Sequence, residues 1–247
     1  MSVELYWMPG CSSCLRMKEF VEQSGIGYVA INVDTEPERA AKLTSQGLRV
    51  PAACVGDKCV NGVNLASVAS LIGVDYSPPE MLSPAELMVR YRRVIQALCD
   101  LIDQIPPEHA GFTLPGRDRD IVTLAGHAGC VMRYFLGKYD DDDFDGFFDD
   151  LEPGHRDAPR LVEFARETFH RTEVWWHDDG HDDPLDRVAP LYWGSRTLAE
   201  GFEREVWHTA QHTRQLAYML EQIGVNPRGA LTPEDLAGLP LPNRIFD

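Results

Sequence analysis

The stretch that decides the fold of the first part of the chain is residues 6–14, with the sequence YWMPGCSSC. It begins at the end of a short β-prone run, 3–7, and leads into a segment, 14–23, whose apolar residues have helical spacing. We therefore expect Cys11 at the N-terminus of a helix, where unpaired backbone N–H groups and the helix dipole stabilise a thiolate. Cys14 lies one turn further on and is placed to resolve a mixed disulfide formed at Cys11.

The segments that follow this motif alternate between strand and helix signals. A second β-prone run covers 28–33, and a helix with proline in its first turn covers 37–46. A hairpin with a Gly-Asp turn covers 51–60, and a last short helix covers 64–72. The predicted order is βαβαββα, an α/β domain over residues 1–75.

The cysteine motif and two later stretches resemble one family. Residues 6–14 resemble the active-site segment of glutaredoxins and of the wider thioredoxin fold, and residues 60–64, VNGVN, resemble the glycine turn before the last glutaredoxin helix. The Val50-Pro51 dipeptide falls where that fold has a cis-proline loop. The resemblance covers residues 1–74. It implies two catalytic cysteines, Cys11 and Cys14, and a thiol-binding set made of Val50, Pro51, Gly62 and Asn64.

Two positions depart from the glutaredoxin pattern. Met8 stands where glutaredoxins usually carry a lysine, and Asn64-Leu65 stands in place of their polar pair at the start of the last helix. Both features help glutaredoxins hold glutathione. The low-molecular-weight thiol cofactor is therefore left open between glutathione and another thiol.

The cysteines allow two other interpretations. Cys11 and Cys14 could form half of a zinc site completed by Cys54 and Cys59, but structural zinc sites prefer a tight second pair. Cys54 and Cys59 instead look like facing positions of the two hairpin strands. The remaining alternative is that the cysteines are inert structural thiols.

A linker separates this part from a second part with a different pattern. Residues 76–82 contain consecutive prolines, which disfavour helix and central strand. Beyond them, apolar residues recur at helical spacing in four long stripes and no strand is predicted; the stripes cover 87–105, 121–135, 161–175 and 198–223. The sequence therefore predicts an all-α four-helix bundle with a C-terminal tail over residues 83–247.

Histidines on two of these stripes form a candidate metal site. His208 and His212 are four residues apart on the last helix, close enough to share a metal ion, and His127 lies beside the inward stripe of the second helix. Three imidazoles from two helices leave a coordination position open, as in catalytic zinc sites. Glu205, one turn before His208, could orient a ligand or act as a base, or it could face solvent. The alternative is three satisfied core histidines without a metal.

The histidine pattern resembles the DinB-like family, which is also described with the YfiT and mycothiol-dependent maleylpyruvate isomerase proteins. The match runs over residues 83–225. It implies that His127, His208 and His212 bind zinc, nickel or a similar divalent ion, and many members are associated with low-molecular-weight thiols.

Composition excludes several classes of function. Acidic residues number 39 against 23 basic ones, for a net charge of −16. This argues against a nucleic-acid binder or a protein docked on anionic lipid. The sequence shows no secretory signal and no apolar run long enough to span a membrane. Six cysteines are too few for a disulfide scaffold. We therefore expect a soluble cytoplasmic protein, and the excess of arginine over lysine fits a bacterial one.

Together the two parts predict a thiol-dependent metalloenzyme. The bundle would activate a small thiol toward an electrophilic substrate, as a transferase or isomerase, because a bound metal deprotonates a coordinating thiol. The CxxC domain would handle disulfide exchange. One alternative is a glutaredoxin-type thiol-disulfide oxidoreductase whose bundle only binds a partner, and another is a metal or redox sensor. A homodimer is left open.

Overall fold

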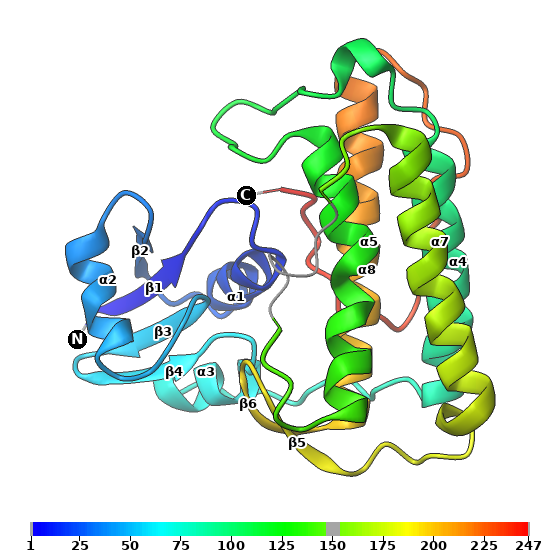
Figure 1. Cartoon of the computed structure of the whole chain (residues 1–247). Helices are drawn as coiled ribbons and strands as arrows, with labels where there is room; N and C mark the ends of the chain where they lie inside the picture. The colour runs from blue at the N-terminus through cyan, green and yellow to red at the C-terminus, as the bar shows by residue number, and fades with distance from the viewer. Residues whose placement is uncertain (1, 147–153, 247) are drawn as a thin grey trace. The chain divides into compact units, whose positions relative to one another are not determined.

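The computed structural model describes residues 2–146 and 154–246 (Figure 1). The chain divides into two compact units. The first holds Met1–Glu80 together with the residues from Pro242 on, and the second holds Met81–Leu241. The division between Glu80 and Met81 falls inside the predicted linker, 76–82. In the described part of the chain, no helix is long and apolar enough to cross a membrane.

The first unit is a thioredoxin-like α/β domain with one four-stranded sheet. The strand order is β2-β1-β3-β4; β1 and β2 are parallel, and the other neighbours are antiparallel. The elements occur in the predicted order, βαβαββα: β1 (Val3–Trp7), α1 (Ser12–Gln23), β2 (Tyr28–Asn32), α2 (Pro37–Thr44), β3 (Ala52–Val55), β4 (Lys58–Asn61) and α3 (Leu65–Ile72).

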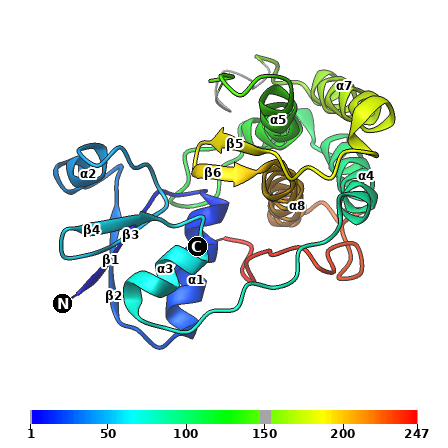
Figure 2. The same ribbon diagram turned by 90° about the horizontal axis from the view of Figure 1, so that it is seen from below.

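The two faces of this sheet carry separate apolar cores. Leu5 of β1 and Ala53 of β3 pack with residues of α1 and α3. Tyr6 and Cys54, which come next along the same strands, pack with Leu43 of α2 on the other face. This alternation is the period of two that a strand imposes on its side chains. Figure 2 shows α1 and α3 together on one side of the sheet and α2 on the other.

The C-terminal residues belong to the first unit, although we expected the tail with the helical part. The Glu19 carboxylate of α1 accepts hydrogen bonds from the backbone N–H groups of Asn243 and Arg244, both at 2.7 Å. The Arg244 guanidinium also donates to Glu22 at 2.9 Å. These charge-assisted bonds hold the tail on α1. Neither Glu19 nor the tail has a local pattern that predicts this pairing across the length of the chain.

The second unit is largely helical, as predicted. It contains α4 (Pro84–Ile102), η1 (Pro107–His109), α5 (Ile121–Asp140), α7 (Ala158–Trp175), the π-helical turn η2 (Trp176–Gly180), β5 (Val188–Leu191), β6 (Gly194–Thr197) and α8 (Leu198–Gln222). Capping boxes at Ser83/Glu86 and Thr197/Glu200 begin α4 and α8. The α8 helix packs on α4 and α5, and α7 packs on the same two helices (Figure 1).

The expectation that the second part contains no strand is wrong. β5 and β6 form a short antiparallel hairpin, with Gly194 at φ 118° in the turn. Ala189 and Leu191 are buried while Val188 and Pro190 are exposed, which is the alternation of a strand. Pro190 hides this pattern in the sequence, because proline lacks the backbone donor of a strand and is confined to edge strands and bulges.

The acidic run at 140–150 is described only in part. The Phe144 ring lies against the backbone of Gly137 on α5 and 6.4 Å from the Tyr134 ring, measured between centroids. The Phe144 ring thus packs on α5, while Asp143 and Asp145 on either side of it are exposed. Phe147 and Phe148 of the same run lie outside the described residues.

Candidate functional site

The cysteine motif lies where β1 passes into α1. Cys11 is the N-cap of α1, and its Sγ accepts a hydrogen bond from the backbone N–H of Cys14 at 3.1 Å. Cys11 is partly exposed and Cys14 is fully buried, and the two are joined in a disulfide. When the pair is reduced, the helix N-terminus and this donor favour the thiolate at Cys11. The accessible cysteine is therefore the one suited to attack.

The register of the sheet brings Pro51 and Gly62, two residues of the predicted thiol-binding set, to the same end of the strands as the cysteine motif. Tyr6, the last residue but one of β1, pairs with Ala52, and Ala52 pairs with Asn61. Pro51 and Gly62 thus lie one residue beyond this row, toward the cysteine motif. Their backbones meet in a hydrogen bond from Gly62 N to Pro51 O at 2.8 Å.

The peptide bond between Val50 and Pro51 is cis. Val50 itself is partly buried against the apolar core on the α2 face. The Asn64 side chain is used as the N-cap of α3, where it accepts from Ser67 N at 3.3 Å. Asn64 therefore shapes the start of α3, and a role in thiol binding remains a prediction.

Gly62 has no room for a side chain. A Cβ at this position would lie 2.2 Å from Met17 Sδ and 3.0 Å from Pro51 Cβ. Only glycine fits such a close approach of backbone to neighbouring groups. The predicted glycine turn is therefore also a packing requirement.

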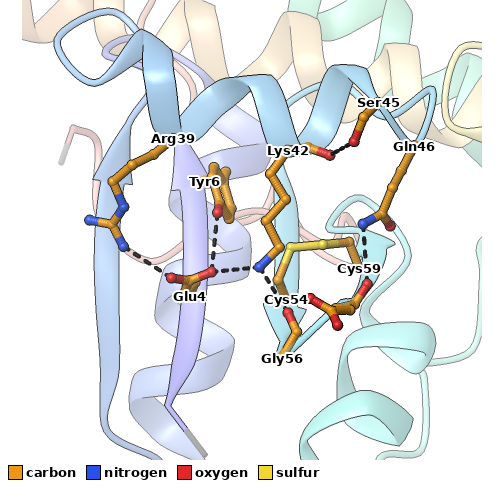
Figure 3. Close-up of a disulfide and its surroundings, with 10 residues drawn as sticks. Glu4, Tyr6, Arg39, Lys42, Ser45, Gln46, Cys54, Gly56 and Cys59 are labelled. Carbon is orange, nitrogen blue, oxygen red and sulfur yellow. Dashed lines mark hydrogen bonds and ion pairs between the residues drawn. A yellow bond between two sulfur atoms is a disulfide. The ribbon is translucent and has the colours of Figure 1, made fainter.

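The second cysteine pair faces across the hairpin, as the sequence indicated. Cys54 of β3 pairs with Cys59 of β4 in the strand register, and the two form a disulfide (Figure 3). All four cysteines of the first unit are thus in disulfides, which does not match the alternative of a zinc site built from them.

The three predicted histidines of the second unit converge. His127 comes from α5 and His208 and His212 come from α8, two helices that pack on each other. All three are buried, and one nitrogen of each lies within 4.8 Å of the others. Ring centroids are 5.4 Å apart for His127–His208, 4.8 Å for His127–His212 and 4.7 Å for His208–His212.

In each of the two α8 histidines, Nδ1 contacts a side chain of the same helix. His208 Nδ1 lies 3.2 Å from Glu205 Oε2, and His212 Nδ1 lies 2.6 Å from Gln215 Oε1. Because an amide oxygen only accepts, His212 Nδ1 carries the proton, which leaves Nε2 as a bare acceptor. Within the described residues, this Nε2 is buried without a hydrogen-bond partner. A buried acceptor of this kind is costly, and a cation would satisfy it.

Burial keeps the three imidazoles neutral. It holds the pKa of His127, His208 and His212 far below the usual value, and the positive charges of Arg119 and Arg204 lower it further. Neutral imidazole is the form that binds a metal ion. The donor set therefore fits a divalent ion such as zinc, which takes nitrogen ligands in this number at catalytic sites.

Glu205 is fully buried, which removes the alternative that it faces solvent. Burial raises the pKa of its carboxyl to about 8. One oxygen contacts His208, and the guanidinium of Arg204 lies 3.9 Å from the same oxygen. The carboxyl is thus placed to orient His208, the first of the two roles considered for it.

Other residues of metal-binding type lie elsewhere. His177 and Asp178 are exposed on η2. The Cys130 thiol donates to His127 O at 3.2 Å. Over residues 2–146 and 154–246, the histidine triad is the one group of three or more His, Cys, Asp or Glu side chains whose ligand atoms lie close enough to share a metal ion.

Gln215 is the site residue that sequence reasoning missed. A signal was available, because Gln215 follows His212 by three residues and thus lies on the same face of the helix. Arg204 offered the same kind of signal, because it precedes His208 by four residues on α8. Arg119 could not be assigned to the site in advance, since it precedes the start of α5.

Comparison with known proteins supports the assignment of the first unit. A family model described as Glutaredoxin matches residues 3–60. Among solved structures, a single-substitution mutant of a thioredoxin-like protein matches with 20% identity and a TM-score of 0.27, covering 29% of this chain and 99% of that one. A glutathione S-transferase from the Antarctic clam Laternula elliptica matches with 16% identity and a TM-score of 0.31, covering 97% of this chain and 100% of that one. No curated protein matches significantly. The family match, the strand order and the CxxC motif at the start of α1 together show that the N-terminal part is a glutaredoxin-type domain of the thioredoxin fold.

Proposed function

We propose that the chain is a thiol-dependent enzyme with two reaction centres. The triad His127, His208 and His212 would hold a divalent ion, zinc in the first place and nickel in the second. A low-molecular-weight thiol would be activated there for transferase or isomerase chemistry on a small electrophilic substrate. The Cys11–Cys14 pair would exchange thiols and disulfides.

One observation carries the metal centre. Three buried, neutral imidazoles present nitrogens within 4.8 Å of one another, and His212 Nε2 has no hydrogen-bond partner in the described part of the chain. A bound divalent ion would supply a Lewis acid that lowers the pKa of a coordinated thiol or water. The resemblance of this pattern to the DinB-like family agrees with the proposal.

The chain's own residues prepare the centre in three ways. Gln215 fixes the tautomer of His212, and Glu205 orients His208. Burial of all three imidazoles limits water at the site and strengthens every electrostatic contact there. Arg119 and Arg204 add positive charge around the triad, which favours an anionic ligand such as a thiolate.

The chemistry at the cysteine pair follows from their unequal exposure. Cys11 is accessible and caps α1, so its thiolate would attack the sulfur of a disulfide substrate and form a mixed disulfide. Cys14 would then attack Cys11 Sγ, which releases the second substrate thiol and restores the internal disulfide. Glutathione or another small thiol serves as the exchange partner in this proposal.

Cobalt substitution tests the metal centre directly. The full chain is loaded with Co²⁺ and titrated with glutathione. We expect ligand-field absorption from the bound cobalt and a thiolate-to-cobalt charge-transfer band when the thiol is added. S-methylglutathione, which cannot ionise at sulfur, is the matched control and gives no such band. No cobalt binding, or a spectrum that the thiol leaves unchanged, contradicts the proposal.

A second function is favoured by the extent of the family match. The Glutaredoxin model covers residues 3–60, and the disulfide chemistry needs only the first unit. The chain would then be a thiol-disulfide oxidoreductase whose helical unit binds a partner or senses a metal. Disulfide turnover that is unchanged by His127→Ala, together with no thiol-dependent cobalt spectrum, identifies this function.

A further inference from the structure

The disulfide between Cys54 and Cys59 lies apart from the cysteine motif. Cys54 packs with Tyr6 and Leu43 in the apolar core on the α2 face of the sheet. Met17 and Val21 of α1, the helix that begins at the motif, pack on the opposite face. The Cys54–Cys59 disulfide therefore lies on the face of the sheet opposite to the one on which α1 packs.

The hairpin that carries this disulfide is held by other contacts. Only residues 55–58 separate the cysteines, and strand pairs flank them on both sides from Ala52↔Asn61 to Val55↔Lys58. Crosslinking so short a loop removes little entropy from the unfolded chain. The hairpin can thus keep its fold when the disulfide is reduced.

Lys42 of α2 and Gln46, just after α2, also fasten the turn of this hairpin without using the cysteines. Lys42 Nζ donates to Gly56 O at 2.8 Å and to Glu4 Oε2 at 2.9 Å. Gln46 Nε2 donates to Asp57 O at 3.1 Å. Figure 3 shows the Lys42 side chain extending from α2 to the hairpin. These hydrogen bonds hold the turn between the two cysteine strands without any contribution from the disulfide.

The two sulfurs differ in access. Cys54 is fully buried, whereas Cys59 is partly exposed on β4, the edge strand of the sheet. Thiol-disulfide exchange requires an attacking thiolate to reach a sulfur atom. Cys59 is therefore the residue of the pair through which exchange with a small molecule would start.

We infer that Cys54 and Cys59 form a second redox couple, which cycles between disulfide and dithiol in the folded protein and exchanges with low-molecular-weight thiols through Cys59. The inference uses neither the histidine triad nor the Cys11–Cys14 pair, so it stands apart from the proposed function.

The exchange balances as follows for a small disulfide, RSSR. The Cys59 thiolate attacks one sulfur of RSSR, forms a Cys59–SR mixed disulfide and releases RS⁻. Cys54, after loss of its proton to solvent, attacks Cys59 Sγ, closes the internal disulfide and releases the second RS⁻. Two electrons pass from the cysteines to RSSR, which becomes two thiols. Reduction of the protein disulfide runs through the same steps in reverse.

A redox titration of the full chain tests the couple. The protein is equilibrated in mixtures of reduced and oxidised glutathione, and then of reduced and oxidised dithiothreitol, starting from either redox state. Acid quenching, alkylation and mass spectrometry give the oxidation state of Cys54–Cys59 peptide by peptide. Hydrogen exchange of β3 reports whether the domain is folded. We expect one reversible curve from both directions, with β3 protected throughout. A pair that changes state only when β3 opens, or never changes state, overturns the inference.

Single substitutions test the entry point. In a Cys11→Ser/Cys14→Ser background, the Cys54→Ser variant should gain one glutathione at Cys59 on exposure to oxidised glutathione. The matched Cys59→Ser variant should gain none at the buried Cys54, with β3 protected in both variants. Equal modification of Cys59 in the first variant and of Cys54 in the second overturns the assignment of Cys59 as the exchanging sulfur.

Discussion

Substitution of Gly62 by alanine tests how the edge of the sheet beside the cysteine motif is packed. The added Cβ would lie 2.2 Å from Met17 Sδ, 3.0 Å from Pro51 Cβ and 3.2 Å from the Pro51 carbonyl carbon. Met17 can rotate, but it is fully buried in the core between the sheet and α1. The two Pro51 atoms belong to the rigid proline ring and to the backbone, and Pro51 O also accepts a hydrogen bond from Gly62 N.

Overpacking of this kind costs about 1–3 kcal/mol. Because each 1.4 kcal/mol is a factor of ten in an equilibrium, the open state of the first unit should become about 5- to 150-fold more populated. Hydrogen exchange of the β1 and β3 peptides in the full chain measures this change directly.

Gly27→Ala is the matched control. Gly27 is exposed, and a Cβ there would meet no atom within 4 Å. Alanine at such a position stabilises by about 0.4–1 kcal/mol or is neutral, because it restricts the unfolded chain. If Gly62→Ala and Gly27→Ala exchange at the same rates, the packing argument for Gly62 is refuted.

Three further predictions concern the sites. Cys11→Ser should abolish reduction of a mixed-disulfide substrate while Cys14→Ser keeps monothiol exchange with a small thiol, measured by thiol release; two variants that behave like the parent contradict the assignment. Neighbouring cations hold the pKa of Glu4 below its usual value, so its carboxylate stabilises the first unit at neutral pH and this stabilisation is lost as the pH falls through the lowered pKa. At neutral pH the parent should have a free energy of unfolding higher than that of Glu4→Gln by less than about 1 kcal/mol, as for a partly exposed pair. Urea titrations should show that this difference vanishes at acid pH, and a difference that does not depend on pH contradicts the prediction. Gln215→Leu should weaken zinc binding by about 10- to 100-fold in a chelator competition, whereas Gln96→Leu on exposed surface should not; equal affinities refute the role of Gln215.

Most of the fold could be predicted because local signals and long-range packing agree. The Gly56-Asp57 turn predicted a hairpin in which Cys54 and Cys59 face each other, and the strand register confirms it. Helical stripes predicted the four long helices, since each buries one continuous apolar face.

The features that could not be predicted from the sequence depend on contacts between residues far apart in the chain, or on a local pattern that one residue obscures. The tail is held by Glu19, more than two hundred residues away, and no periodicity encodes that pairing. Pro190 concealed the β5–β6 hairpin. The convergence of His127 with His212 was inferred from faces alone, and Gln215 became part of the site only once the direction of the His212 ring was known.

The measurement that tests the account most directly is a zinc titration of the full chain followed by native mass spectrometry. The account predicts one Zn²⁺ per chain, lost in His127→Ala and His212→Ala but retained in His177→Ala, whose side chain is 89% exposed. Hydrogen exchange of α5 and α8 shows whether the variants keep their fold. Absence of bound zinc in the parent, or equal zinc binding by the His212→Ala and His177→Ala variants, would contradict the metal centre.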